Sequence, residues 1–211
     1  EEDLAVKYGG LNHFFWTTEV RAPQLDILAD LRKRLRTKGF TDLLRESAPD
    51  PMGFKSNREL ATELFRMTGV LPYLGDRHTC EFFPGYITNR KNMRDYKLMR
   101  TTIQERLQGR ETQRKSVDRV RRTTPNAETI RFFRARSRET AADIIAAHSQ
   151  GKVFIDVGNV PNQGQISNLP LGTVVETAVR VDRNGFSPIN FGALPESVLG
   201  LVEPCARVFN L

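Results

Sequence analysis

Near the start of the chain stands the segment Lys7-Tyr8-Gly9-Gly10-Leu11-Asn12-His13-Phe14-Phe15-Trp16. Residues 4–8 have the composition of a short strand, and the two glycines predict a turn directly after it. An Asn-His pair follows the glycines, and three aromatic residues come after the histidine. His13 is therefore either a packed core residue or a ligand presented at the mouth of a turn.

Further along the chain, two segments have strand patterns and several have helical ones. Residues 152–157 form an apolar run of strand length, which predicts a buried strand, and residues 172–181 predict a second strand. Apolar residues at helical spacing or helix caps predict helices over 26–36, over 41–45, after an Asn57 cap, and over 138–149 after a Ser137 cap. Helices that flank a few strands indicate an α+β fold.

The bulk composition is that of a globular protein without membrane spans. The chain has 211 residues, 39% of them hydrophobic, which suits one domain over 1–211. Cys80 and Cys205 are too few for a disulfide framework and form no CxxC pair, so we expect a reducing, cytoplasmic setting. The chain opens at Glu1 without a methionine, and we therefore expect it to be the later part of a longer protein.

The net charge of +7 is concentrated in one stretch. Between Arg90 and Glu139 there are 16 basic and 6 acidic residues, whereas the rest of the chain has 16 basic and 19 acidic ones. Residues 90–122 also read as a surface helix or a pair of helices. Such a block can bind nucleic acid, but it lacks interleaved aromatic residues, so a solvated helix face or an oligomer contact is the favoured interpretation.

Ionisable residues gather in a second place, the turn over residues 73–84. His78 and Glu81 lie three apart with Asp76 before them, a pattern open to a metal half-site or an acid–base pair. The alternative is a plain helix start, with Asp76 as its N-cap and Arg77 paired with Glu81. A Cys80–His78 dyad is disfavoured, because residues two apart rarely face each other.

Phosphate-binding motifs are missing from the chain, since neither G-x-G-x-x-G nor G-x-x-x-x-G-K-[ST] occurs. The polar segment 159–166 follows a predicted buried strand, a position at which loops often contact ligands. A plain turn explains its composition equally well.

Four ordered blocks resemble the C-terminal domain of glycoside hydrolase family 4, the NAD- and metal-dependent glycosidases. The blocks are Gly10-Leu11-Asn12-His13-Phe14, Gly75-Asp76-Arg77-His78 with Glu81-Phe82, Val157-Gly158-Asn159-Val160-Pro161-Asn162, and Ile166-Ser167-Asn168-Leu169-Pro170 followed by Val174-Val175-Glu176 and Asp182-Arg183-Asn184-Gly185. The resemblance covers most of the chain. It implies a C-terminal domain of the lactate dehydrogenase-like type, with helices packed on a small, mostly antiparallel sheet.

The resemblance also implies a reaction and its cofactors. Family members bind NAD in a preceding nucleotide-binding domain, use a divalent metal such as Mn²⁺, and cleave a carbohydrate by oxidation, elimination, addition and reduction, outside the usual two-carboxylate scheme. The Asp-Arg-His block is similar to the α-glucosidase, α-galactosidase and α-galacturonidase branch. The N-terminal NAD-binding domain is absent from this chain, which therefore has no cofactor-binding residues of its own.

Residue roles follow from the same resemblance. His13 matches the metal ligand, and Asn12 its neighbour at the substrate. Tyr73 lies near the position of a general base in some members. Asp76 and His78 would line the pocket as catalytic residues, and Arg94 falls near a substrate-contacting arginine. The aromatic residues 14–16 would meet the nucleotide-binding domain.

Two alternatives of other classes stay open. Without the first half of the enzyme, the chain could be a truncated, non-catalytic oligomerisation module, in which the basic segment 90–136 makes a homo-oligomer contact. A basic nucleic-acid-binding protein is the third hypothesis.

Overall fold

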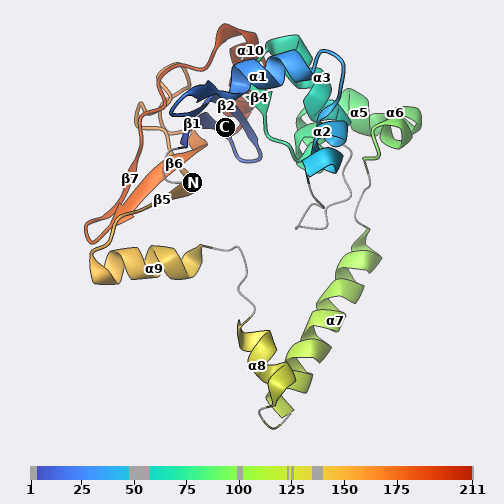
Figure 1. The fold of residues 1–211 in the computed structure, drawn as a ribbon, viewed down its shortest axis with the longest axis vertical. Coiled ribbons are helices and arrows are strands. Elements are labelled where there is room, and N and C mark those ends of the chain that lie inside the picture. The colour runs from blue at the N-terminus through green and yellow to red at the C-terminus, as the bar shows by residue number, and fades with distance from the viewer. Residues whose placement is uncertain are drawn as a thin grey trace. The chain divides into compact units, whose positions relative to one another are not determined.

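The computed structural model describes residues 4–47, 58–98, 102–122, 124, 126–134 and 140–210. The chain divides into two compact units, one formed by residues 1–98 with 143–211 and the other by residues 99–142. The first unit contains a β-sheet, shown in blue and orange in Figure 1, and most of the helices.

The sheet has seven strands among the described residues, in the order β3-β2-β1-β6-β5, with β4 on β2 and β7 on β6. Every pair of these strands is antiparallel. The strands are β1 (Ala5–Leu11), β2 (Phe14–Ala22), β3 (Leu25–Asp26), β4 (Leu71–Pro72), β5 (Phe154–Pro161), β6 (Val174–Asp182) and β7 (Gly185–Pro188). The prediction of an α+β fold with a mostly antiparallel sheet is confirmed.

Helices occupy much of the remaining described chain. In the first unit they are α1 (Ile27–Arg34), α2 (Phe40–Ser47), α3 (Glu59–Thr68), α4 (Asp76–Thr79), a 3₁₀ turn η1 (Cys80–Phe82), α5 (Pro84–Thr88), α6 (Arg90–Asp95) and α10 (Glu196–Val208). The second unit holds α7 (Ile103–Arg122) and α8 (Ala127–Arg134), and α9 (Ala141–Gln150) crosses the boundary.

The turn between the first two strands lies at Asn12 and His13, not at the glycines. Gly9 and Gly10 lie inside β1. Glycine is needed at both positions because neighbouring atoms approach the backbone too closely for a side chain. A Cβ atom on Gly10 would lie 2.5 Å from the carbonyl oxygen of Phe14, and one on Gly9 would lie 2.9 Å from the ring of Phe191. The glycines therefore mark a close backbone approach, and the predicted Gly9-Gly10 turn is wrong.

The main core lies on one face of the sheet, against α3 and α10. It includes Leu11, Phe14, Trp16, Leu60, Leu64, Val175, Val198 and Val202. Phe14 is 2% exposed and Trp16 is 0% exposed. The expectation that residues 14–16 form a surface for another domain is therefore wrong for these two side chains, which pack inside their own unit.

Strand β5 differs from the predicted buried strand. Its residues alternate in exposure, and Ile155 and Val157 are 56% and 44% exposed. The other face of β5 and β6 is covered, since Val160 and Val179 pack in a cluster with Ala147 of α9. An antiparallel sheet can leave one face uncovered in this way.

Helix α1 begins at a side-chain cap, which was not among the predicted caps. Asp26 accepts a hydrogen bond from the Ala29 N–H and so caps α1. Asn57 and Ser137, the caps predicted for two later helices, lie outside the described residues, as does Arg138. In the second unit no described residue of α7 is buried, as expected for a charged surface helix. A search of the described helices finds none with the length and apolar character needed to cross a membrane.

Candidate functional site

The turn between β1 and β2 presents His13 in an unusual backbone conformation. Its φ angle is +55°, in the left-handed region that few residues other than glycine adopt. The His13 N–H donates a hydrogen bond of 2.7 Å to Oε2 of Glu176, which lies in β6. A contact between residues 163 positions apart therefore ties the turn to a distant strand.

Three rings cluster at this turn. The imidazoles of His13 and His78 stack with their centroids 4.4 Å apart and their planes 17° from parallel. The Tyr73 ring lies 5.2 Å from that of His13. Tyr73 follows β4, and its N–H donates to the carbonyl of Phe15 in β2 at 3.0 Å, while His78 lies in α4. The structure thus brings together three of the residues predicted from the sequence.

The surroundings of these rings shift their protonation. Desolvation by burial and the neighbouring His13 lower the pKa of His78, which favours a neutral imidazole. Burial and the charge of Glu176 raise the pKa of Tyr73. The phenol therefore keeps its proton near neutral pH and can donate a hydrogen bond. Burial also raises the pKa of Glu176, although its hydrogen bond from His13 acts in the opposite direction.

His13 has the atom that a metal site would use. Its Nδ1 is buried and has no hydrogen-bond partner among the residues that the structure describes, which is uncommon for a buried polar atom. An imidazole nitrogen is a common ligand of divalent metals. Among the residues that the structure describes, no group of three or more His, Cys, Asp or Glu side chains could hold an ion. The residues present fit one ligand of a metal site, not a complete set.

Asp76 makes different contacts from those expected of a pocket residue. Its side chain is 0% exposed, and its two carboxylate oxygens accept hydrogen bonds from the N–H groups of Leu60 and Ala61, at 2.9 and 3.0 Å. These groups belong to the first turn of α3, whose N–H groups have no partner within the helix. Asp76 therefore caps α3 although it lies 16 positions after Leu60 in the sequence. The alternative prediction made it the cap of its own helix.

The other two predicted site residues differ in position. Asn12 is exposed at the hairpin turn, directly before His13. Arg94 is exposed in α6, and no hydrogen bond or ring contact among the described residues links it to His13, Tyr73 or His78. The structure brings Asn12 to the cluster and leaves Arg94 apart from it.

Glu176 and Tyr8 belong to the same cluster but were not predicted as site residues. Glu176 is 6% exposed, and burial together with Asp156 and Glu176 raises the pKa of Tyr8 to about 12. The Tyr8 ring packs 5.6 Å from Phe15, which in turn lies 5.2 Å from Tyr73. A carboxylate inside the apolar run of β6 was the signal in the sequence that could have identified Glu176.

Two other candidates from the sequence have structural explanations. Cys80 is 3% exposed, and burial raises its pKa to about 11, which leaves the thiol protonated and unreactive. In the polar segment 159–166, the Asn162 side chain is 2% exposed. Its Nδ2 donates to the carbonyls of Ile166 and Leu169, at 3.0 and 2.9 Å, and so organises the loop from inside.

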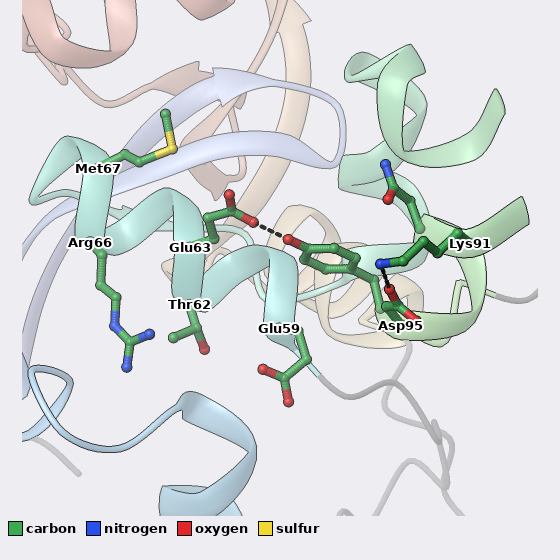
Figure 2. Close-up of a pocket in the computed structure, with 9 residues that line it drawn as sticks. Glu59, Thr62, Glu63, Arg66, Met67, Lys91 and Asp95 are labelled. Carbon is green, nitrogen blue, oxygen red and sulfur yellow. Dashed lines mark hydrogen bonds and ion pairs between the residues drawn. The ribbon is translucent and has the colours of Figure 1, made fainter. Parts of the chain in front are cut away.

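A separate pocket of about 680 Å³ lies between α3 and α6. Figure 2 shows the side chains that line it, Glu59, Thr62, Glu63, Arg66, Met67, Lys91, Asn92, Asp95 and Tyr96. None of the residues in the His13 cluster belongs to this lining.

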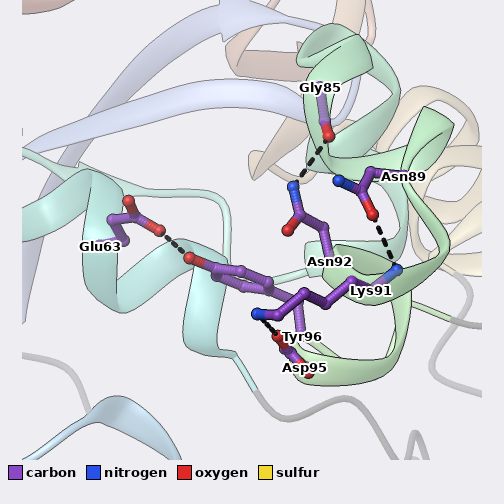
Figure 3. Close-up of polar contacts among 7 residues, drawn as sticks. All are labelled: Glu63, Gly85, Asn89, Lys91, Asn92, Asp95 and Tyr96. Carbon is purple, nitrogen blue, oxygen red and sulfur yellow. Dashed lines mark hydrogen bonds and ion pairs between the residues drawn. The ribbon is translucent and has the colours of Figure 1, made fainter.

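The polar groups of the pocket are largely paired with one another. In Figure 3 the Tyr96 hydroxyl donates to Oε2 of Glu63 at 2.5 Å, and Lys91 pairs with Asp95 at 2.7 Å. The Asn92 amide donates to the carbonyl of Gly85 at 3.1 Å. Because these groups already have partners, the His13 cluster is the stronger candidate site.

The fold and the cluster together define a class of protein. In the described part of the chain, an antiparallel sheet with helices on one face presents, at a hairpin turn, a histidine whose buried nitrogen has no partner and whose neighbours do not complete a metal-ligand set. These features describe an α+β domain with one candidate metal ligand at a hairpin turn.

Comparison with known proteins identifies the family. The model of the family 4 glycosyl hydrolase C-terminal domain matches residues 8–211, and the chain belongs to this family. An alpha-galacturonidase of Bacillus subtilis strain 168 is 34% identical over 200 residues, which are 93% of this chain and 43% of that protein. An alpha-galacturonidase of Thermoanaerobacterium saccharolyticum is 28% identical over 213 residues, which are 99% of this chain and 44% of that protein. The chain thus spans less than half the length of these curated relatives.

Solved structures agree with this assignment. A Bacillus subtilis protein described as a glucosidase matches with a TM-score of 0.79 and 32% identity, over 99% of this chain and 47% of that one. A 6-phospho-beta glucosidase of Thermotoga maritima, solved with manganese, NAD⁺ and glucose-6-phosphate, matches with a TM-score of 0.62 and 16% identity, over 99% of this chain and 43% of that one. The second similarity shows the fold alone.

Proposed function

We propose that this chain is the substrate- and metal-site domain of an NAD- and divalent-metal-dependent glycosidase that acts on α-glycosides. The observation that carries the proposal is the His13 imidazole, whose buried Nδ1 has no partner within the described ranges and which lies at a turn in a left-handed conformation. Strained backbone of this kind persists where the surrounding structure enforces it, and it is concentrated at functional sites.

The proposal assigns a role to five of the predicted site residues. His13 supplies one nitrogen ligand to the metal, and Asn12 contacts the sugar beside it. His78, stacked on His13 and kept neutral by its lowered pKa, is a proton acceptor at the edge of the cluster. Tyr73 keeps its proton in the absence of a cation, and a nearby positive charge would shift its pKa downward. Arg94 would contact the substrate at a position away from the ring cluster.

The missing parts of the site belong to the rest of the longer protein. A divalent metal such as Mn²⁺, held in part by His13, would supply Lewis-acid polarisation of a substrate oxygen. The described residues offer one ligand and no phosphate-binding turn, so the remaining metal ligands and the NAD site would lie in the preceding nucleotide-binding domain. Oxidation, elimination, addition and reduction is the reaction sequence that this arrangement would serve.

The relatives suggest which sugars to test first. Four relatives are named alpha-galacturonidases and a further one is an alpha-galactosidase of Bacillus subtilis. We therefore propose α-galacturonides as the first substrate class and α-galactosides as the second.

The test uses the full-length protein with NAD, Mn²⁺ and aryl α-galacturonides. We expect cleavage that disappears when either NAD or Mn²⁺ is left out. We also expect His13→Ala to lower cleavage and Mn²⁺ affinity by about 100-fold or more, because a direct metal ligand is lost. Since the His13 ring is not part of the main core, the melting temperature should change little.

The matched control is His148→Ala, because His148 is exposed in α9 and its Nδ1 lies 3.3 Å from the carbonyl oxygen of Asp182, which is not a residue of the ring cluster. It should leave Mn²⁺ binding and cleavage unchanged. A folded full-length protein that binds no Mn²⁺ and cleaves none of these sugars would contradict the proposal. The non-catalytic oligomerisation module would then become the leading hypothesis.

A further inference from the structure

Glu176 is a buried carboxylate that no step of the proposed reaction uses. It lies in β6 with 6% of its surface exposed, among residues that are mostly apolar. Its only side-chain hydrogen bond among those found in the described residues is the one that Oε2 accepts from the His13 N–H, at 2.7 Å. A buried carboxylate is costly unless it is paired, so this contact requires an explanation.

The register of the sheet explains how Glu176 reaches the turn. In the pairing of β1 with β6, Glu176 stands opposite Gly10. Paired residues of neighbouring strands share a face of the sheet, and Gly10 has no side chain to occupy that face. The carboxylate can therefore extend over Gly10 to the turn residue three positions further along the chain.

The contact acts on the strained residue itself. A left-handed conformation costs a non-glycine residue roughly 1–2 kcal/mol, and His13 adopts it with a φ of +55°. An acceptor on its N–H stabilises this conformation over alternatives that would turn the amide away. The orientation of the amide and of the side chain on the same Cα are coupled, so the acceptor also limits where the imidazole can point.

We propose that Glu176 is a positioning residue, which holds the His13 amide and thereby keeps the His13 imidazole directed at the metal site. Its role as a hydrogen-bond acceptor, not its charge, is what the site requires. The inference rests on the proposed function in so far as His13 is a metal ligand. The hold on the turn itself is independent of metal.

Two readouts on the full-length protein separate these parts. Hydrogen–deuterium exchange of peptides covering residues 9–16, measured without metal, reports the hold on the His13 amide. Titration with Mn²⁺, followed by the electron paramagnetic resonance signal of the free ion, reports the affinity of the site.

Three variants provide the comparison. Glu176→Met has a similar length but no acceptor, and we expect about tenfold faster exchange at the turn and about 10–100-fold weaker Mn²⁺ binding. Glu176→Gln retains an acceptor oxygen, and both readouts should stay within about threefold of the wild type. Thr177→Val alters the adjacent buried position of β6, whose side chain is 1% exposed, and should change neither readout.

Each contrary outcome has a definite meaning. Unchanged exchange and affinity in Glu176→Met would overturn the proposal. A loss of affinity in Glu176→Gln as large as in Glu176→Met would also overturn it, because the charge and not the acceptor would then matter. If Glu176→Met does not fold, Glu176→Ala takes its place as the variant without an acceptor, and a loss of affinity in Glu176→Gln would still overturn the proposal. Wild-type protein that binds no Mn²⁺ but shows the exchange difference would support the hold on the turn and contradict the proposed function.

Discussion

Two regions rich in ionisable side chains, the His13 turn and helix α7, use those side chains differently. Glu176 at the turn, like Asp76 in the nearby sequence block at α4, is almost fully buried and bonds to the backbone N–H of a distant segment. In α7 the charges stay in solvent and pair along the helix, as Arg114 does with Glu111 at 2.9 Å. Burial turns a charged group into a structural or functional constraint, whereas a solvated charge constrains little.

The strongest test of this difference replaces the buried carboxylate that caps α3. Asp76→Ala leaves the N–H groups of Leu60 and Ala61 without an acceptor in a buried place, and we expect a loss of roughly 4 kcal/mol in the free energy of unfolding. Urea denaturation of the full-length protein measures it. The control is Asp95→Ala, because Asp95 is an exposed carboxylate in α6 and its removal should change stability far less.

A contrary result would reopen the role predicted from the sequence. If Asp76→Ala keeps its stability and loses cleavage with NAD and Mn²⁺ present, Asp76 acts at the site and not as a cap.

The same carboxylate should make stability depend on pH. Burial outweighs the two backbone hydrogen bonds and raises the pKa of Asp76 to about 6. In the unfolded chain the pKa of Asp is about 3.9, so the folded protein binds this proton more tightly. Stability must then fall as pH rises from about 4 to about 6, by up to about 3 kcal/mol.

Asp76→Asn isolates this contribution, because it removes the titration and keeps one acceptor. The free energy of unfolding of the wild type relative to Asp76→Asn should decrease over that pH range. An increase would mean that the two N–H groups lower the pKa of Asp76 by more than burial raises it.

Much of the fold could be predicted from local sequence patterns. The helical spacing near Asp26 and the charged composition of α7 depend on nearby residues, and the structure confirms both elements. The position of the first turn could not be predicted in this way. Gly9 and Gly10 look like turn residues, but they are glycines because Phe191 and Phe14 approach them in space. The Phe191 contact joins segments far apart in sequence, and the Phe14 contact depends on where the β1–β2 hairpin turns.

The candidate site likewise contains residues that the sequence predicted and contacts that it could not predict. The family resemblance predicted His13, Asn12, Tyr73 and His78 as site residues. The structure brings the rings of His13, Tyr73 and His78 together, and Asn12 directly precedes His13. The capping role of Asp76 and the hydrogen bond from His13 to Glu176 join segments that only the folded chain makes neighbours. Spacing within a motif carries no information on such contacts.

Helix α7 should show the smallest effect. Arg110 and Arg114 are exposed, and no described residue of α7 is buried. The Arg110→Ala, Arg114→Ala double variant should therefore change the melting temperature by less than about 2 °C. Gln108→Ala, at another exposed position of α7, is the control for the substitution itself.

Size-exclusion chromatography and a nucleic-acid gel shift at two salt concentrations test whether the double variant changes assembly or nucleic-acid binding. If the double variant breaks an oligomer, the basic segment is a subunit interface; if it abolishes a salt-sensitive gel shift, the segment binds nucleic acid. Either result would remove the difference between the two regions, because the charges of α7 would then be buried in a complex, as the carboxylate at the His13 turn is buried in the fold.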